Sequence, residues 1–351
     1  MTWQDMKIGN YIIGIDKPCF IIAEVGMNHN GSFELAEQMI KSAADAGADA
    51  VKFQNFKTED FLSDKKLPIT YKYHGKEITE PLWDACKRSE FKREWIPDLK
   101  KMCDELGVVF FSTPTSEEGI DDLINSGVEA LKNGSDYLTQ LPLLRYMGTT
   151  GVPVIVSTGM ANQQDVDDAV EAVKSGGKSR VVLMHCVSTY PTAIEDLNLN
   201  KMVTLMERYN LPVGFSDHTG DFKAAVQAVT LKACMVEKHF TVDKNLPGAD
   251  QNISCNPEEF NILVREIRDA EKRMGAKNIS PAKGEMCHKD QSRIGLVAAR
   301  DIQAGSVLVT EDVAYRKPAL GLLPKQLNDV LGRVASVSIS SGEPLRSEQL
   351  S

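Results

Sequence analysis

The sequence lacks the features that define several protein classes. Its seven cysteines are far apart and form no CxxC pair, so neither a disulfide framework nor a zinc knuckle is indicated. It has no run rich in Lys and Arg, and its formal net charge is -9, so the basic patch of a nucleic-acid-binding protein is missing. No basic-then-apolar segment opens it, and no apolar stretch approaches the roughly 20 residues of a membrane helix. We therefore expect a soluble, cytoplasmic protein that binds neither nucleic acid nor membranes.

From residue 19 onward, short apolar runs alternate with longer amphipathic segments. The runs have the length and β-branched content of buried strands, at 19–25, 49–54, 108–113, 129–133, 153–158, 181–186, 212–216 and 234–240. The segments between them show helical patterns that end at or near glycine, as helices commonly do. Eight β-then-α units predict the α/β class and a TIM (β/α)8 barrel. A doubly wound sheet is the competing architecture, but no GxGxxG follows the first strand, and the count of eight favours closure.

Residues 55–90 are too long for an ordinary connection between a strand and a helix. On the catalytic face of a barrel, a segment of this length would form a lid. Its Tyr71, Tyr73, His74 and Trp83 would then cover a substrate. The alternatives are a loop that packs its own aromatic residues and a contact with a second subunit.

The chain divides into three parts by its pattern of apolar runs, polar segments and glycine turns. We predict a barrel domain at 1–276, a linker at 277–292 and a second domain at 293–351 with short strands, glycine turns and one short helix. About 60 residues offer little independent core, so we expect the second domain to gain stability by packing on the barrel or on another subunit.

Charged and polar residues recur where the predicted strands end, and barrels of this kind place their chemistry at that edge. His218 and His239 follow the last two strands, and two imidazoles meeting there indicate a site for one divalent metal. Lys52 and Lys132, among hydroxyl side chains and glycine backbone, indicate a site for a phosphate or carboxylate group. The simpler alternatives are two hydrogen-bonded histidines at the rim, and rim ion pairs of Lys52 with Glu24 and of Lys132 with Asp136. The other polar residues of this ring are Gln54, Thr113, Ser135, Ser157, Ser188, Tyr190 and Ser216.

An ordered set of motifs resembles the sialic acid (nonulosonic acid) synthase family over about residues 8–350. The motifs are AEVGMNHNG, AVKFQ, FFSTP, LKNGS, VSTGM, HCVSTYPT, GFSDHT, EKHFT, PGAD and the closing ARDIQAGSVLVTEDV and RKPALG. The resemblance implies a TIM barrel joined to a C-terminal antifreeze-like (SAF) domain. It also implies the condensation of phosphoenolpyruvate with an N-acylated hexosamine, and a swapped dimer in which each SAF domain caps the partner's barrel.

The resemblance also implies roles for individual residues. His218 and His239 match the metal ligands, and two imidazoles with several oxygens favour manganese over zinc, with magnesium or cobalt as alternatives. Positions that hold phosphoenolpyruvate are matched by Lys52, Gln54, Thr113, Lys132, Ser135, Ser157 and Ser216. Glu24 matches a carboxylate near the reacting carbons, and Tyr190 and Asp250 match residues that contact the sugar. No organic cofactor is implied.

Some positions depart from the family pattern and bear on the identity of the sugar. Asp136 and Tyr137 stand where users of N-acetylmannosamine resemble one another in carrying Gly-Glu, and Ser188 replaces a common asparagine. The closing motif carries Arg316 and Lys317, either of which would reach the acyl group of the sugar. Gln251 replaces a frequent histidine at a variable position. Taken together, these departures leave two expected acceptors, N-acetylmannosamine or a 6-deoxy diacetamido sugar, as in legionaminate synthesis.

Two other functions fit the same residues. A class I aldolase or lyase would use one desolvated lysine as a Schiff-base nucleophile. A sugar-binding or ice-binding protein would use the barrel as a scaffold only. The histidine pair disfavours the first alternative, and the two lysines disfavour the second.

Overall fold

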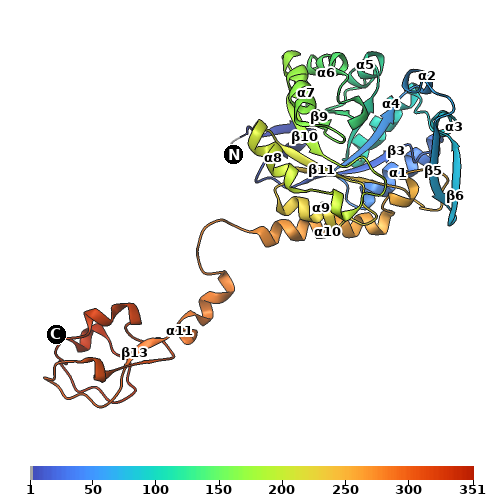
Figure 1. Cartoon of the computed structure of the whole chain (residues 1–351). Coiled ribbons are helices and arrows are strands. Elements are labelled where there is room, and N and C mark those ends of the chain that lie inside the picture. Colours follow the sequence, from blue (N-terminus) through green and yellow to red (C-terminus); the bar gives the residue numbers. More distant parts are fainter. Residues whose placement is uncertain (1–2) are drawn as a thin grey trace. The chain divides into compact units, whose positions relative to one another are not determined.

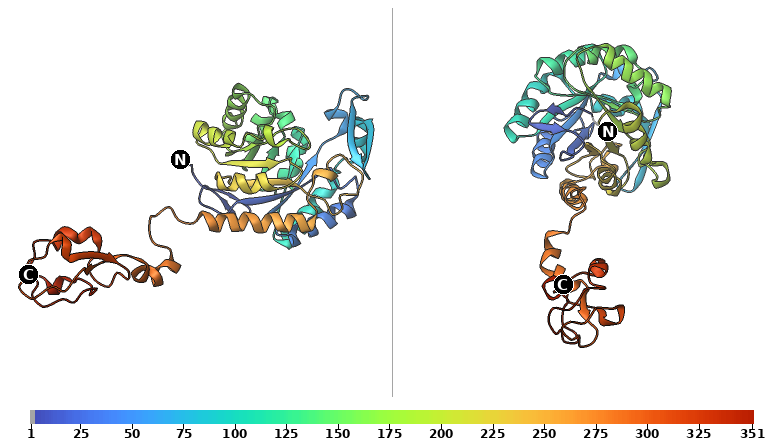
Figure 2. Two further views of the ribbon diagram at one scale, coloured as in Figure 1. Left: turned by 60° about the horizontal axis from the view of Figure 1, so that its bottom comes forward. Right: turned by 90° about the vertical axis from the view of Figure 1, so that its left-hand side faces the viewer.

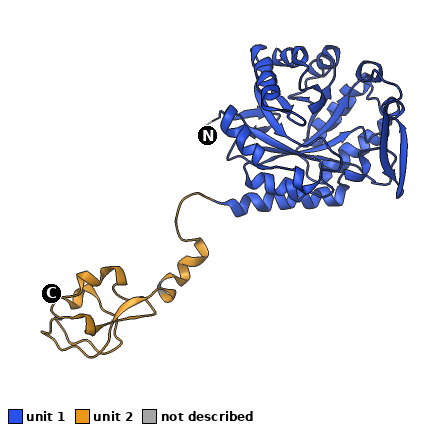
Figure 3. Cartoon of the chain, viewed as in Figure 1, with its two compact units in different colours: residues 1–275 blue, residues 276–351 orange. Residues whose placement is uncertain are grey.

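The computed structural model describes residues 3–351, and the chain forms two compact units, residues 1–275 and 276–351 (Figure 3). The predicted boundary between barrel domain and linker, at 276/277, falls next to this division. Within the described part of the chain, no helix combines the length and the hydrophobicity that crossing a membrane requires.

The first unit is a closed barrel of eight parallel strands, with β12 paired to β3 (Figure 1). The strands are β3 (Phe20–Gly26), β4 (Ala50–Asn55), β7 (Val109–Pro114), β8 (Leu131–Asn133), β9 (Val154–Ser157), β10 (Val181–His185), β11 (Val213–Asp217) and β12 (Met235–His239). Each lies within or beside one of the eight predicted runs. The predicted TIM barrel is confirmed, and the doubly wound alternative is wrong because the sheet closes.

Helices surround the barrel, as the two further views show (Figure 2). They are α1 (Phe33–Asp45), α4 (Ile96–Leu106), α5 (Glu117–Asn125), α6 (Leu141–Gly148), α7 (Gln163–Ser175), α8 (Asn200–Tyr209), α9 (Lys223–Thr230) and α10 (Pro257–Met274). Local signals set their ends. Asn256 caps α10 through a reciprocal pair of hydrogen bonds with Glu259, and Gly107 ends α4 in the left-handed conformation that glycine adopts most easily.

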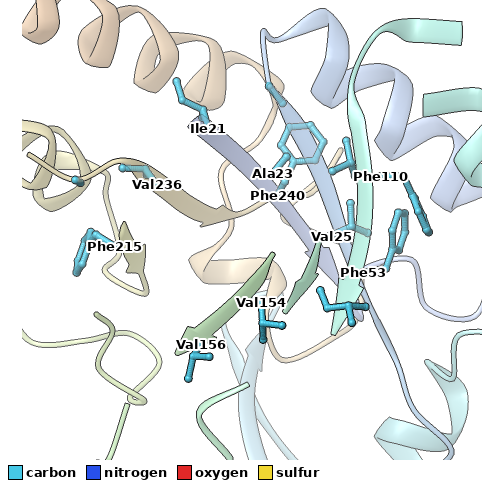
Figure 4. Packing of buried hydrophobic residues seen from close by; sticks show 14 of the residues in the cluster. Ile21, Ala23, Val25, Phe53, Phe110, Val154, Val156, Phe215, Val236 and Phe240 are labelled. Atoms are coloured by element: carbon cyan, nitrogen blue, oxygen red, sulfur yellow. The ribbon is translucent and has the colours of Figure 1, made fainter. Parts of the chain in front are cut away.

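The side chains of each strand alternate between two cores. Ile21, Ala23 and Val25 of β3 face outward and pack with Phe53 and Phe110 under the helices (Figure 4). The intervening Phe20 and Ile22 face inward, as expected for the two-residue period of a strand. The next inward residue of β3 is Glu24, so the apolar interior gives way to charge towards the carboxyl ends of the strands.

A small N-terminal hairpin, which was not predicted from the sequence, closes the opposite end of the barrel. It consists of β1 (Met6–Ile8) and β2 (Tyr11–Ile13), paired antiparallel. Ile8 and Ile13 are fully buried in one cluster with the residues at the amino ends of the barrel strands, such as Phe20. Access to the interior is therefore from the carboxyl ends.

The long segment after β4 is folded rather than irregular. It contains α2 (Thr58–Phe61), an antiparallel hairpin of β5 (Pro68–Tyr73) and β6 (Lys76–Pro81), and α3 (Leu82–Arg88). The Arg88 guanidinium donates two hydrogen bonds of 2.7 Å to the Glu80 carboxylate, which fixes the hairpin to α3. We call residues 58–88 the hairpin segment.

The second unit has a core of its own, which includes Leu296, Ile302, Ile339 and Leu345. Its regular elements are α11 (Lys289–Ser292) and the antiparallel pair β13 (Gly295–Ala298) and β14 (Val313–Arg316). The expected single short helix is a 3-10 segment, Pro324–Asp329, and further 3-10 turns lie at Lys283–His288, Thr310–Asp312 and Ser347–Gln349. In the barrel unit, 3-10 turns lie at Arg93–Trp95, Ser135–Tyr137, Ile194–Asp196 and Gln251–Ile253.

Candidate active site

A cavity of about 940 Å³ opens at the carboxyl ends of the barrel strands. It brings together all of the barrel residues that the sequence predicted for the site: Glu24, Lys52, Gln54, Thr113, Lys132, Ser135, Ser157, Ser188, Tyr190, Ser216, His218, His239 and Asp250. The two remaining candidates belong to the second unit, where Arg316 ends β14 and Lys317 follows it, both exposed. Most of these residues come from different strands, so barrel closure assembles the site.

The floor of the cavity is a buried cluster of two lysines and two glutamates. Lys52 Nζ lies 2.8 Å from Glu24 Oε2 and 3.9 Å from Glu237 Oε2, and Lys132 Nζ lies 3.4 Å from Glu237 Oε1. All four side chains are at most 5% exposed. Lys52 thus pairs with Glu24 inside the barrel and not at its rim. The alternative pairing of Lys132 with Asp136 is wrong, since Glu237 takes that place.

Glu237 is the member of the cluster that sequence reasoning missed. It precedes His239 by two residues on β12, so the strand period places both side chains on the inner face. Ser216 Oγ donates a 3.1 Å hydrogen bond to Glu237 Oε1. The spacing Glu-Lys-His was a usable signal, because it alternates an inward acid, an outward lysine and an inward histidine.

The charges of the cluster shift one another's pKa values. Burial alone would favour the neutral form of Glu237, but Lys132 and Lys52 outweigh it and lower its pKa to about 2. Burial likewise opposes the charge of Lys52, yet Glu237 and Glu24 hold its pKa above the usual range. For Glu24, burial prevails and the pKa is raised. Glu237 is therefore the fixed anion, and Glu24 is the carboxyl group that exchanges a proton more readily.

The two histidines stand side by side with their ring centroids 5.5 Å apart. His218 Nδ1 lies 2.8 Å from the Val187 carbonyl, which can only accept, so Nδ1 carries the proton and Nε2 keeps its lone pair. His239 Nδ1 is buried without a hydrogen-bond partner among the described residues and lies 3.6 Å from Asp250 Oδ2. Burial lowers both pKa values to about 4, so both rings are neutral at neutral pH.

This donor set suits a metal that keeps open coordination positions. Within residues 3–351, no group of three or more His, Cys, Asp and Glu side chains could hold a metal ion, so a closed structural zinc site is not formed there. Two imidazole nitrogens with free lone pairs, beside a carboxylate, leave room for water or substrate oxygens. The unpartnered nitrogen of His239 is the observation that fits a missing ligand best.

Small polar groups line the wall between β8 and β10. Lys52 Nζ donates to Thr113 Oγ1 at 3.1 Å, and the Gly159 amide donates to Ser135 Oγ at 3.0 Å. A Cβ at Gly159 would lie 2.3 Å from Ser188 Oγ and 2.6 Å from Ser135 Oγ, so only glycine lets these hydroxyls approach. Ser188 Oγ is buried without a partner in the described structure. The wall therefore has hydroxyl and amide groups that are available to a ligand.

The hairpin segment contributes to the cavity differently from the prediction. Of its four predicted aromatics, Tyr71 lines the cavity and donates a 2.7 Å hydrogen bond to Glu80. Tyr73 and His74 pack on each other with centroids 4.3 Å apart, and Trp83 lies beneath the Lys65 ammonium. The alternative that the loop packs its own aromatics thus describes these three. Ile69 and Leu82, which sequence reasoning did not single out, line the cavity instead.

Comparison with known proteins finds a matching family model for each of the two units. The NeuB family model matches residues 39–279, and the SAF domain model matches residues 294–351. The chain is 36% identical over 341 residues to the N,N'-diacetyllegionaminic acid synthase of Legionella pneumophila, covering 96% of each protein. It is also 36% identical over 350 residues to the pseudaminic acid synthase of Campylobacter jejuni, covering 97% of this chain and 98% of that protein.

A solved structure supports the relationship. The N-acetylneuraminic acid (sialic acid) synthetase of Leptospira borgpetersenii superposes with a TM-score of 0.74 at 35% identity, covering 81% of this chain and 95% of that one. The family model covers more than half of the chain. The chain therefore belongs to the NeuB family, the sialic acid synthases.

Proposed function

We propose that this protein condenses phosphoenolpyruvate with an N-acylated amino hexose, giving a sialic-acid-like sugar and inorganic phosphate. The acceptor is N-acetylmannosamine or a 2,4-diacetamido-2,4,6-trideoxyhexose. The observation that carries the proposal is the buried cluster of Lys52 and Lys132 with two glutamates, beside a pair of neutral histidines in one cavity. This arrangement places the positive charges of the two lysines, a carboxyl group that can exchange a proton, and two histidines that can bind a metal around one cavity that would hold both substrates.

The lysines supply what a phosphorylated small acid needs. Their charges are held inside the barrel, where water screens them little, and Thr113, Ser135 and Ser157 add donors around them. In the structure, the ammonium groups are balanced by Glu24 and Glu237. A bound phosphate or carboxylate would take over part of that balance. Gln54, which donates a 2.8 Å hydrogen bond to Glu24, and Ser216 hold the two carboxylates in position meanwhile.

The reaction can be written with all bonds accounted for. The methylene carbon of phosphoenolpyruvate forms a bond to the aldehyde carbon of the open-chain sugar, and positive charge develops on the enol carbon. The aldehyde C=O bond opens in this step, and its oxygen takes up a proton to become a hydroxyl. Water adds to the positively charged carbon, the bond between that carbon and the phosphate oxygen breaks, the remaining hydroxyl loses its proton to become the ketone carbonyl, and phosphate leaves. Glu24 accepts the proton from the attacking water, for which its raised pKa suits it, while the anionic Glu237 stabilises the positive charge. Tyr190 and Asp250 contact the sugar.

A divalent metal ion would be held by His218 and His239, with manganese favoured and magnesium or cobalt as alternatives. When bound, it supplies Lewis acidity at the aldehyde oxygen. The Val187 carbonyl orients the ring of His218 through its Nδ1 atom. No organic cofactor is needed in this scheme.

We also propose that the second unit acts across a homodimer. Each SAF domain would cap the partner's barrel, and Arg316 or Lys317 would bind the acyl group of the sugar there. Their exposure within their own unit leaves both side chains available for such a contact. We further propose that the protein works in the cytoplasm, where phosphoenolpyruvate is present.

The Schiff-base alternative is disfavoured by the same cluster. A lysine nucleophile needs a neutral amine at neutral pH, which burial among apolar groups provides. Lys52 is buried beside carboxylates instead. Glu237 and Glu24 raise its pKa, so its amine stays protonated at neutral pH. A pure scaffold would not explain why four charged side chains are buried at the floor of an open cavity, since uncompensated burial of charge is costly.

The direct test is an assay of phosphate release with the purified full-length protein, phosphoenolpyruvate, Mn2+ and a panel of amino sugars. We expect release that depends on both the sugar and the metal, together with one new nine-carbon acid per phosphate. A covalent adduct after borohydride reduction with a keto acid, without phosphate release, would instead establish the aldolase.

A further inference from the structure

We infer that Asp217 and Lys238 are positioning residues for the proposed metal site. The two side chains form a buried ion pair on the outer side of the barrel wall, and they hold the turn that follows His218. The inference rests on the proposed function, because it concerns the metal ion that His218 and His239 would bind. It does not depend on which sugar the protein accepts.

The ion pair stands at positions where the other barrel strands carry no such charge. Ser216, Glu237 and His239 point into the barrel, so the strand period turns Asp217 and Lys238 outward, where α9 packs on both strands. No other outward residue of the eight barrel strands, all of which lie in the described part of the chain, is an Asp, Glu, Lys or Arg. The charges thus occur on the two strands that lead to the histidines.

An ion pair is a costly choice at these positions. Asp217 and Lys238 are at most 1% exposed, and Asp217 Oδ2 has no hydrogen-bond partner among the described residues. Both charged groups have therefore lost their contacts with water. A pair of apolar side chains of similar volume often stabilises a fold as well or better. Stability alone does not account for the pair, and its hydrogen bonds indicate another role.

These hydrogen bonds converge on Thr219. The Thr219 amide donates a 2.8 Å hydrogen bond to Asp217 Oδ1, and Lys238 Nζ donates a 2.7 Å hydrogen bond to the Thr219 carbonyl. The Thr219 hydroxyl lies 2.7 Å from Asp217 Oδ1 and 2.8 Å from the Asp221 carbonyl, and it can donate to either. Lys238 Nζ is also 3.5 Å from Asp217 Oδ1. The ion pair therefore holds both the amide and the carbonyl of this residue.

Holding Thr219 also fixes His218, its neighbour in the chain. The peptide group between them is bonded on both sides, because its N–H donates to Asp217 and its carbonyl accepts a 2.9 Å hydrogen bond from the Thr192 amide. The imidazole is held at Nδ1, which lies 2.8 Å from the Val187 carbonyl. With the backbone and Nδ1 both held, the direction of the Nε2 lone pair is set.

The ion pair also joins the two strands that lead to the site. The register of β11 and β12 places Asp217 directly opposite Lys238, so the pair adds a side-chain link at the carboxyl ends of these strands. His218 and His239 directly follow the two partners in the chain, and their ring centroids lie 5.5 Å apart. Two ligands held at a fixed spacing lose little freedom when a metal ion binds, which favours binding.

The experiment measures the Mn2+ affinity of the full-length protein from the EPR signal of the free ion. Asp217→Leu combined with Lys238→Met removes both charges together, so no unpaired charge is left buried. We expect this double variant to bind Mn2+ roughly 10- to 100-fold more weakly, the usual effect of removing groups that orient a metal ligand. Phosphoenolpyruvate affinity, measured without metal, should be unchanged, and turnover should recover at high Mn2+ concentration.

Two further double variants separate positioning from packing. Asp217→Asn with Lys238→Gln is also uncharged but still offers an acceptor to the Thr219 amide and a donor to its carbonyl. It should bind Mn2+ several-fold more tightly than the variant with Leu and Met. Asp49→Leu with Arg268→Met is the matched control, because this ion pair, with 2.8 Å between Oδ2 and Nη2, lies at the amino ends of the strands. It should leave Mn2+ affinity unchanged.

Three results would overturn the inference. They are wild-type Mn2+ affinity in the folded variant with Leu and Met, equal weakening in both uncharged variants of the pair, and equal weakening in the matched control. If circular dichroism shows that the variant with Leu and Met does not fold, hydrogen exchange of the metal-free wild type decides. The Thr219 amide should already exchange slowly before metal is added, and rapid exchange would contradict its being held by Asp217.

The proposed function can fail separately. Mn2+ affinity that depends on the ion pair, with no phosphate release from any amino sugar, would overturn the proposed reaction and leave this inference standing. Phosphate release with Mn2+ affinity that is independent of the pair would do the reverse. Absence of Mn2+ binding by the wild type would remove both the metal site and its positioning residues.

Discussion

Lys52 Nζ lies 2.8 Å from Glu24 Oε2, and both side chains are almost completely buried. The two residues occupy inward-facing positions on the neighbouring strands β3 and β4, and the register of these strands pairs Glu24 directly with Lys52. In the proposed reaction, this contact joins the group that binds phosphate to the group that moves a proton. Substituting the two residues should therefore give different kinetic effects.

Replacing the carboxyl group should impair chemistry more than binding. We expect Glu24→Gln to lower kcat by roughly 10²- to 10⁴-fold, the usual contribution of a positioned acid or base. The amide can still pack beside Lys52, so phosphoenolpyruvate affinity should change much less. Steady-state kinetics and calorimetric titration measure the two effects. A variant with unchanged kcat would remove Glu24 from the proton-transfer step.

Removing either lysine should impair phosphoenolpyruvate binding. Each charge-assisted contact contributes roughly 1.5 to 3 kcal/mol, so Lys52→Ala or Lys132→Ala should weaken binding by about 10- to 150-fold. Sugar affinity should stay within a few-fold, and Lys201→Ala, an exposed lysine on α8, is the matched control. Equal loss of sugar affinity would show that the lysines are misassigned.

Removal of the metal should abolish activity reversibly. A site with two protein ligands and open positions is expected to exchange its ion, so EDTA should inactivate and added Mn2+ should restore turnover. His218→Ala or His239→Ala should lose both metal binding and activity while the barrel remains folded. His185→Ala is the histidine control, since His185 bonds the Leu197 carbonyl and does not line the main cavity as described. Full turnover by either site variant would contradict the assignment.

The stability of the barrel should depend on pH through His29. Burial among Phe53, Phe91 and Trp95 lowers the pKa of His29 to about 4. In the unfolded chain, the pKa of His29 is near 6.5. Between pH 4 and pH 6.5 the unfolded chain therefore binds more protons than the folded chain, so the free energy of unfolding rises with pH from about 4 to about 6.5. This single group contributes on the order of 3 kcal/mol over that window.

Urea unfolding at several pH values checks this dependence. His29→Gln should be less stable at pH 7 and should show a shallower rise in unfolding free energy between pH 4.5 and 6.5 than the wild type. Identical slopes for the two proteins would show that His29 does not carry the effect.

Complementation between two inactive proteins tests the swapped dimer. We expect an Arg316→Ala, Lys317→Ala double variant to lack acyl-group binding, and His218→Ala to lack the metal. After subunit exchange, one barrel of each heterodimer would have both histidines and an intact cap, restoring about half of the sites. No recovery after verified exchange would mean that each chain caps its own barrel or that these two cations do not contact the sugar.

The sequence by itself determined the barrel, because its signals are local. Eight apolar runs, glycine-ended helical patterns and polar residues at the strand ends specify the elements and the edge where chemistry occurs. The inward position of Glu237 was also encoded, since it shares the strand period with His239. Residues 1–18 and 55–90 carry no comparable pattern in the sequence, because short hairpins such as β1–β2 and β5–β6 depend on what they cover.

Only the tertiary structure decided which groups meet across the barrel. Lys132 pairs with Glu237 and not with the nearby Asp136, although Asp136 is four residues away and Glu237 is 105. Two further contacts of this kind join His239 Nδ1 with Asp250 and Phe61 with Tyr137. Such contacts depend on closure and strand register, which are set by the packing of the whole barrel. A residue's own neighbours in the chain specify its strand and face, but not the partner on the far side.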